Sequence, residues 1–180
     1  MSTHNAARTD PVTDAPSPLP DEMFLAFPDD DTPEARATLS FSRSPTVLLT
    51  FAANRFTRSA ARVYQQEYGI GAMDWRMLVM LTRVPGCSVA LASKTIGIDK
   101  AAVSRSLTRL EQAGLAVAET PLPDPRRRDW TLTDKGRALH ERILHTALER
   151  QRKLLEGFSE AEVEMFNDFL RRFLGNLETL

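Results

Sequence analysis

The 180-residue chain contains one cysteine, Cys87, and three histidines. A single cysteine excludes an intrachain disulfide and a zinc site built from several cysteines. His140 and His145 lie five positions apart, which is not the i, i+3 or i+4 spacing of helical metal ligands. We therefore expect no metal and no cofactor, and we interpret Cys87 as a buried thiol rather than an oxidant sensor.

Glycine is also scarce, and the 8 glycines form neither a GxGxxG pattern nor a phosphate-binding loop. The chain has no nucleophile elbow, and no apolar run approaches the length that spans a bilayer. Its N-terminal residues lack the basic and apolar regions of a signal peptide. These absences argue against an enzyme and against a membrane protein, and they predict a cytoplasmic location.

Charge is unevenly distributed along the chain, although the formal net charge is only −1. Residues 1–45 hold 3 basic and 8 acidic side chains and 7 of the 11 prolines, whereas residues 46–180 hold 20 basic and 16 acidic ones. Such an acidic, proline-rich segment is typical of a disordered arm. The remaining part is mildly basic, which is compatible with a nucleic-acid partner.

Residues 88–114 have the pattern of two short helices joined by a tight turn. Ser88 is predicted to cap the first helix and Gly97 to end it, while Asp99 caps the second, which ends before Gly114. This order predicts a helix-turn-helix, whose second helix contacts the major groove of DNA.

The second helix is predicted to bury an apolar stripe and to expose small, hydroxylic and cationic side chains. These candidate DNA-binding residues are Lys100, Ala101, Ser104, Arg105, Thr108 and Arg109. Side chains of these types can reach base edges or phosphates. An ordinary solvated helix face has a similar composition, so this helix alone leaves both interpretations open.

A short hairpin is predicted to follow, with strands over 116–120 and 129–132. Its loop carries three consecutive arginines, Arg126, Arg127 and Arg128. Adjacent arginines repel one another and gain little from packing, which favours contacts with phosphates or a narrow minor groove over a solvated charge run. Asp124 is expected to pair with Arg126 or Arg128 and thereby stiffen this wing.

At these residues the chain resembles the MarR (multiple antibiotic resistance repressor) family of bacterial transcription factors, over about 46–178. The resemblance rests on several short motifs at the family's spacing: Ala102-Val-Ser-Arg105, Leu110-Glu111, Gly114-Leu115, Asp124-x-Arg126 and Leu132-Thr-x-x-Gly136. Pro125, Ala116 and the long N-terminal arm depart from the family pattern.

The expected fold class is mainly α with a small β-hairpin wing (α+β). The resemblance implies a winged helix-turn-helix at about 72–133, dimerisation helices at about 46–68 and 134–178, and a disordered arm over 1–45. Thr133 should cap a helix running to about Glu156, and Ser159-Glu-Ala-Glu162 has the spacing of a capping box that opens a final helix.

The final helix is predicted to carry an apolar seam with alternating spacings of three and four. The seam consists of Val163, Phe166, Leu170, Phe173 and Leu177. The resemblance implies that this seam joins two copies into a two-fold dimer on double-stranded DNA. An intrachain helical hairpin is the alternative explanation of the same pattern.

The function implied by the resemblance is that of a homodimeric repressor that binds a pseudo-palindromic operator and is released by a small aromatic or phenolic effector. The candidate effector-binding residues are Arg55, Phe56, Arg58, Tyr64 and Trp75. Two alternatives stay open: a winged-helix dimer that acts as a protein-interaction scaffold, and an activator with the same mode of DNA binding.

Overall fold

The computed structural model describes residues 19–27, 36–119 and 128–180. The chain forms two compact units, residues 1–56 and residues 57–180, and the division falls inside helix α1 (Pro45–Tyr68). Each unit is described on its own. Within the described ranges, no helix combines the length and the apolar composition that a membrane span requires.

The first unit holds a short 3-10 helix, η1 (Asp21–Met23), and two strands, β1 (Leu25–Ala26) and β2 (Thr38–Leu39). The strands pair antiparallel, with Leu25 opposite Leu39. The expectation of a disordered arm over 1–45 did not include this short ladder, because composition averaged over that segment conceals its few apolar residues. The buried hydroxyl of Ser40 accepts a hydrogen bond from the backbone N–H of Arg43 (3.2 Å) just before α1 begins.

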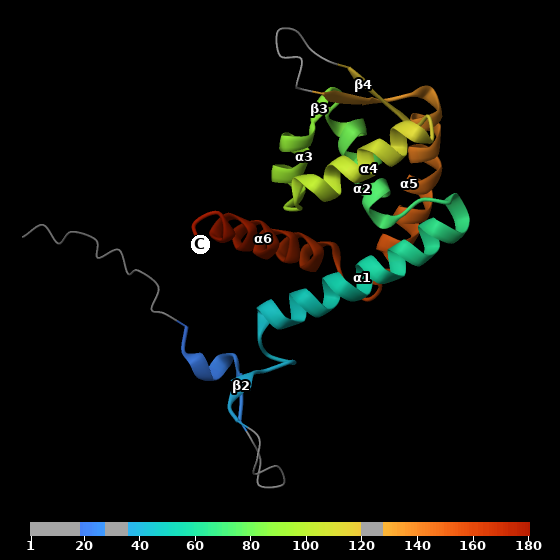
Figure 1. Ribbon diagram of the computed structural model, residues 1–180. Helices are drawn as coiled ribbons and strands as arrows, with labels where there is room; N and C mark the ends of the chain where they lie inside the picture. Colours follow the sequence, from blue (N-terminus) through green and yellow to red (C-terminus); the bar gives the residue numbers. More distant parts are fainter. Residues whose placement is uncertain (1–18, 28–35, 120–127) are drawn as a thin grey trace, which may run out of the picture. The chain divides into compact units, whose positions relative to one another are not determined.

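The second unit contains the end of α1 and most of the regular structure. Its remaining elements are α2 (Ala72–Arg83), β3 (Cys87–Ser88), α3 (Val89–Ile96), α4 (Lys100–Gln112), β4 (Ala116–Glu119), β5 (Asp129–Leu132), α5 (Asp134–Leu154) and α6 (Glu160–Leu177) (Figure 1). The predicted fold class, mainly α with a small antiparallel sheet, is confirmed.

Four helices begin at capping residues that the sequence predicted. These N-caps are Ser88, Asp99, Thr133 and Ser159, and each side chain accepts a hydrogen bond from a backbone N–H of the first helical turn. Gly97 and Gly114 have φ values of 71° and 69°, so each supplies the left-handed residue that follows a helix end. Local sequence therefore determines where the helix-turn-helix begins and ends.

The sheet has three strands in the order β3-β5-β4, one more than the predicted hairpin. Trp130 on the central strand lies opposite Cys87 on one side and Ala118 on the other. Cys87 opens β3, a strand that the sequence did not predict, because a two-residue strand is stabilised by its distant partner rather than by its own sequence. Cys87 is 1% exposed, which confirms that it is buried.

The core lies where α2, α4 and α5 meet the sheet. Its largest fully buried side chains include Trp130, Met77, Leu78, Leu107 and Ile143. Gly136, in the first turn of α5, is required for this packing: a Cβ there would overlap the carbonyl oxygen of Leu115. The backbone N–H of Thr133 donates to the same oxygen (3.1 Å), so α5 starts in direct contact with the end of the α4–β4 turn.

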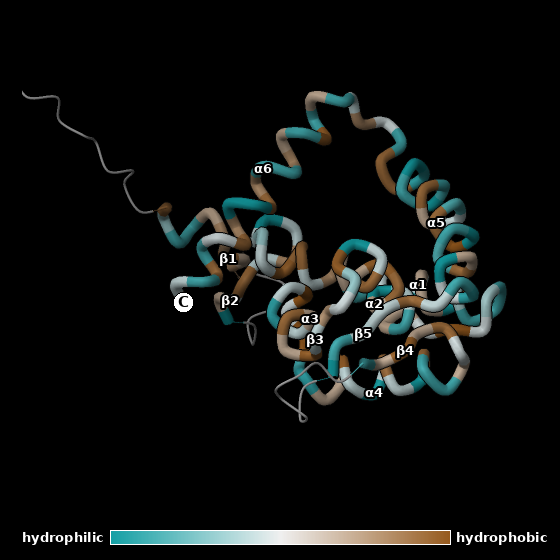
Figure 2. Tube along the Cα trace, turned by 90° about the horizontal axis from the view of Figure 1, so that it is seen from above, coloured by the Kyte–Doolittle hydropathy of each residue, from teal (hydrophilic) through white to brown (hydrophobic). Residues whose placement is uncertain are grey.

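Helix α6 buries none of its residues. Phe166 is 47% exposed and Leu177 50%, and the neighbouring Phe169 and Leu174 are 55% and 63% exposed. Apolar and polar residues alternate along this helix in Figure 2. Of the predicted apolar seam, therefore, Phe166 and Leu177 are exposed within their own unit, while Val163, Leu170 and Phe173 are partly buried.

Candidate nucleic-acid interface

Helix α4 separates a buried face from an exposed one. Val103, Leu107 and Leu110 are at most 1% exposed and fasten the helix to the core. On the opposite side four predicted DNA-binding residues are exposed: Lys100, Ala101, Ser104 and Arg105. Thr108 is partly buried at the edge of this face. The structure thus brings small, hydroxylic and cationic side chains together on one solvent-facing surface.

Arg109 belongs to the same predicted set, but its guanidinium has an intramolecular partner. Its Nη2 donates to Oδ1 of Asp74 on α2 at 2.6 Å, and its Nε lies 3.4 Å from Oδ2. The side chain of Arg109 is 51% exposed and that of Asp74 only 10%. Arg109 therefore contributes to the attachment of α4 to α2.

Asp74 and Ser106 form a buried polar contact that was not identified from the sequence. The Ser106 hydroxyl is fully buried and donates to Oδ1 of Asp74 at 2.5 Å, while the backbone N–H of Gly71 donates to Oδ2 at 3.3 Å. The available signal was the position of Asp74 on the apolar face of α2, because a buried carboxylate needs a partner. With Arg109, these groups fix the position of α4 against α2.

At the base of the wing, Arg128 connects the sheet to α4. Its Nη2 lies 2.7 Å from Oε1 of Glu111, and its guanidinium carbon lies 4.7 Å from the centre of the Trp130 ring. The other predicted wing residues, Asp124, Arg126 and Arg127, lie outside the described residues. Arg128 therefore holds the start of β5 beside the end of α4.

The predicted effector-binding residues are divided between the two units. Arg55 and Phe56 belong to the first unit, Arg58 is exposed, and Tyr64 is 3% exposed in the core of the second unit. Burial raises the pKa of the Tyr64 hydroxyl, and Arg150 opposes this shift. Trp75 lines a cavity of about 310 Å³.

Trp75 connects α2 to α5 through aromatic contacts. Its ring stacks on that of His140 on α5, with ring centres 5.2 Å apart. The centre of the Tyr64 ring, on α1, lies 5.7 Å from that of Trp75. Burial lowers the pKa of His140, which favours the neutral imidazole. No group of three potential metal-ligating side chains occurs in the part of the chain that the structure describes.

Comparison with known proteins finds similarity to transcriptional regulators. The MarR family model matches residues 68–128. The HTH-type transcriptional regulator PecS of Dickeya dadantii is 32% identical over 117 residues, which cover 62% of this chain and 67% of PecS.

Solved structures extend the likeness beyond the helix-turn-helix. A MarR/EmrR family transcriptional regulator from Acinetobacter sp. ADP1 superposes with a TM-score of 0.74 and 31% identity, covering 79% of this chain and 100% of that protein. BpsR of Bordetella bronchiseptica, whose DNA binding is regulated by 6-hydroxynicotinic acid, superposes with a TM-score of 0.60 and 25% identity, covering 70% of this chain and 98% of BpsR. The chain belongs to the MarR family of transcriptional regulators, which bind DNA and are not enzymes.

Proposed function

We propose that the protein is a homodimeric repressor that inserts α4 into the major groove at each half of a pseudo-palindromic operator. The observation that carries the proposal is the contrast among the arginines around α4. Arg109 and Arg128 are held by carboxylates of the same chain. Arg105 is exposed and has no hydrogen-bond or ion-pair partner among the described residues, so its guanidinium is available to a base or a phosphate.

In this proposal the side chains divide into three groups. Ala101, Ser104, Arg105 and Thr108 face base edges in the major groove, where arginine is suited to a bidentate contact with guanine. Lys100, Arg126 and Arg127 neutralise phosphates, which contributes affinity without sequence preference. Arg109 and Arg128 act mainly by holding α4 and the wing in place for these contacts.

Dimerisation follows from the uncovered face of α6. Phe166, Phe169 and Leu174 are about half exposed or more, and exposure of apolar side chains to water is unfavourable. A second copy of the same helix can cover them. A two-fold axis would place the two α4 helices roughly 34 Å apart, about one turn of DNA, which is why the operator should be pseudo-palindromic.

Release from DNA is proposed to depend on a small effector. The support is the likeness to BpsR, whose DNA binding responds to 6-hydroxynicotinic acid. A ligand of this kind acts through its different affinity for the DNA-competent and the released states. The effector of this protein is proposed to be an aromatic acid or phenol of similar size.

The test is the salt dependence of binding to promoter DNA next to the protein's own gene. We expect log affinity to fall steeply with log salt, and the slope to lessen by about one unit in Arg126→Ala. Arg105→Ala should cost about 1–3 kcal/mol at the preferred site and relax its sequence preference. Arg152→Ala, an exposed change on α5, serves as the matched control.

Two results would contradict the proposal. If no upstream fragment bound even at low salt, a protein-interaction scaffold would be favoured. If Arg105→Ala weakened binding to random DNA as much as to the preferred site, Arg105 would be a phosphate contact and the assignment of base reading to it would be wrong.

A further inference from the structure

The first unit is folded without an apolar core. Among its described residues, 19–27 and 36–56, Ser40 and Ser44 are the only buried ones. Backbone hydrogen bonds hold the unit together: the β1–β2 ladder, and the N–H of Ser40 donating to the carbonyl of Phe24 at 2.6 Å. A two-stranded ladder with no covering layer is marginally stable in water. We therefore expect this unit to bury its apolar side chains against another surface.

Residues 19–27, here called the arm segment, expose apolar and acidic side chains together. The apolar ones are Leu19, Met23 and Phe27, which are 64%, 49% and 59% exposed. Asp21 and Glu22 lie in η1 and are exposed as well. A surface that covers this segment should therefore offer apolar walls together with cationic groups.

The second unit has such a surface in the cavity of about 310 Å³ between α2 and α3, here called the α2–α3 groove. Its apolar walls are formed by Trp75, Val79, Met80 and Ile96. Val79 is 39% exposed, which is high for an aliphatic side chain beside the core.

The charged residues that line the α2–α3 groove are Arg76 and Arg83. Nη2 of Arg76 donates to the Thr57 hydroxyl at 3.1 Å, and neither guanidinium pairs with a carboxylate among the described residues. No acidic residue of the described ranges lines the groove. The groove thus has a positive charge that its own unit leaves unbalanced.

Charge also separates the α2–α3 groove from the other exposed apolar surface, that of α6. The first half of α6 carries four acidic residues and no basic one: Glu160, Glu162, Glu164 and Asp168. Placing Asp21 and Glu22 beside these carboxylates would cost repulsion, whereas Arg76 and Arg83 attract them. The arm segment therefore fits the groove better than it fits α6.

We propose that the arm segment of one copy docks in the α2–α3 groove of a second copy. Met23 packs against the apolar walls, while Asp21 and Glu22 face Arg76 and Arg83. Under two-fold symmetry the same contact forms twice, because each copy supplies one arm segment and one groove. The inference rests on the proposed function only for the presence of a second copy. It adds an interface made by residues that lie outside the matched family region, 68–128.

Such a contact would attach each helix-turn-helix to the opposite copy. The groove includes Thr95 and Ile96, which end α3 directly before the turn at Gly97. The arm segment would then act as a strap across the dimer, in addition to the proposed contact between the α6 helices.

The experiment traps the contact as a disulfide between two full-length chains. A tagged chain with Met23→Cys is co-expressed with an untagged chain with Val79→Cys, and the purified protein is oxidised with glutathione disulfide. A disulfide forms only between side chains whose Cβ atoms come within about 4.5 Å, so it reports direct contact. Cys87 is 1% exposed and should not compete. We expect a tagged–untagged product in which mass spectrometry finds positions 23 and 79 joined.

Two matched controls accompany the trap. Ala90→Cys places a thiol at another exposed position of α3 that does not line the groove, and it should give no product with Met23→Cys. Arg83→Glu on the Val79→Cys chain should lower the yield about fivefold, through repulsion of the acidic pair. Asp21→Lys with Glu22→Lys on the tagged chain should restore it.

The outcomes separate this inference from the proposed function. If the protein sediments as a dimer and no product joins positions 23 and 79, the docking is wrong and the proposed dimer stands. If a single chain carrying both cysteines forms the disulfide only within itself, the second copy is the wrong occupant. An unchanged yield in Arg83→Glu would overturn recognition by charge. Operator binding of the same samples tests the proposed function alone, since neither Met23 nor Val79 is among its proposed DNA contacts.

Discussion

Nη2 of Arg109 on α4 lies 2.6 Å from Oδ1 of Asp74 on α2, and the same oxygen accepts the hydrogen bond of the buried Ser106 hydroxyl. The helix proposed to contact DNA is therefore attached to its neighbour by polar contacts as well as by its apolar face. Because the Asp74 carboxylate is nearly inaccessible to solvent, water competes only weakly for these hydrogen bonds.

Replacing Asp74 should weaken this attachment. We expect Asp74→Ala to lower the free energy of unfolding by about 1–3 kcal/mol, since it leaves the Ser106 hydroxyl buried without its acceptor. Urea denaturation followed by circular dichroism measures the change. Asp168→Ala removes an exposed carboxylate that pairs with Arg171 and should change stability little. Equal stability of the two variants would contradict a structural role for Asp74.

Gly136 should tolerate no larger residue. A Cβ at this position overlaps the Leu115 carbonyl oxygen, which also accepts the hydrogen bond from Thr133. We expect Gly136→Ala to cost about 3 kcal/mol or more, because backbone rather than a flexible side chain must move. Gly175→Ala on α6 meets no atom within 4 Å and should be neutral or slightly stabilising. Thermal unfolding of the two alanine variants compares them directly, and a stable Gly136→Ala would contradict the close approach.

His140 should make stability depend on pH. Burial lowers its pKa below the ordinary value of 6.5, so the unfolded chain binds a proton at a pH where the folded chain does not. The contribution of the neutral His140 to the free energy of unfolding is present above pH 6.5 and is lost as the pH falls from 6.5 toward the pKa of the folded state. We expect His140→Phe, which keeps a ring against Trp75, to lose less stability than the unmodified chain between about pH 7.5 and pH 5.

The measurement is the free energy of unfolding in urea at each pH, taken as the difference between the two chains so that the other titrating groups cancel. His145→Gln is the matched control, since the side chain of His145 is 79% exposed. A pH dependence that His140→Phe leaves unaltered would show that the imidazole does not cause it.

The apolar face of α6 should determine the oligomeric state. We expect Phe166→Asp to shift the protein from dimer to monomer at micromolar concentration. The ring of Phe166 is exposed in the single chain, and an aspartate in its place would bury a charge in the proposed interface. Sedimentation velocity measures the change. Gly175→Asp adds the same charge on the side of the helix away from the seam, where a Cβ meets no atom within 4 Å, and should leave the dimer intact. If the unmodified chain sedimented as a monomer, the prediction of a dimer would be wrong.

Local signals in the sequence were sufficient for most helix ends. Ser88, Asp99, Thr133 and Ser159 act within one helical turn, so their capping is visible without knowledge of the fold. The exposed face of α4 followed from the 3.6-residue period in the same way. These features depend on residues at most four positions apart.

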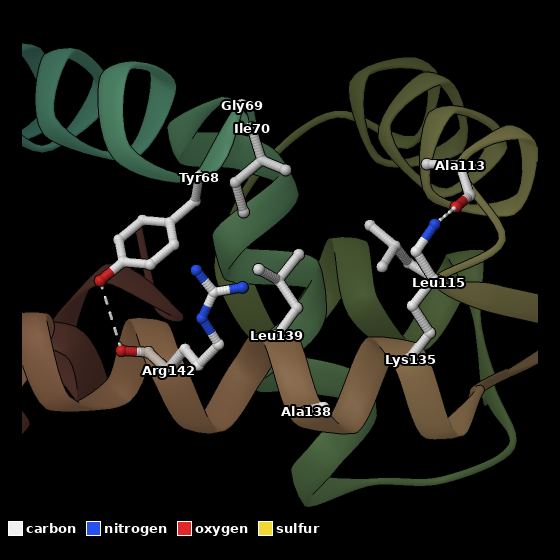
Figure 3. A pocket seen from close by; sticks show the side chains of 9 residues that line it. All are labelled: Tyr68, Gly69, Ile70, Ala113, Leu115, Lys135, Ala138, Leu139 and Arg142. Atoms are coloured by element: carbon white, nitrogen blue, oxygen red, sulfur yellow. Dashed lines mark hydrogen bonds between the residues drawn. The ribbon is translucent and has the colours of Figure 1, made fainter.

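Features that depend on distant residues were not predicted. Strand β3 exists because Cys87 pairs with Trp130, and the contact between Asp74 and Ser106 joins residues 32 positions apart. A cavity of about 400 Å³ lined by Tyr68, Leu115 and Arg142 (Figure 3) likewise needs α1, α4 and α5 in place. Arg109 and Arg128 looked equivalent to Arg105 in the sequence, and only their carboxylate partners distinguish them.

The uncovered face of α6 has a consequence for how the amount of this protein would control transcription. If operators bind only the proposed dimer, then below the dissociation constant of that dimer the active species rises with about the square of the chain concentration. Halving synthesis would then reduce operator occupancy by more than half. The last helix would thus set the sharpness of the genetic response to the number of chains per cell, although none of the proposed DNA contacts lies on it.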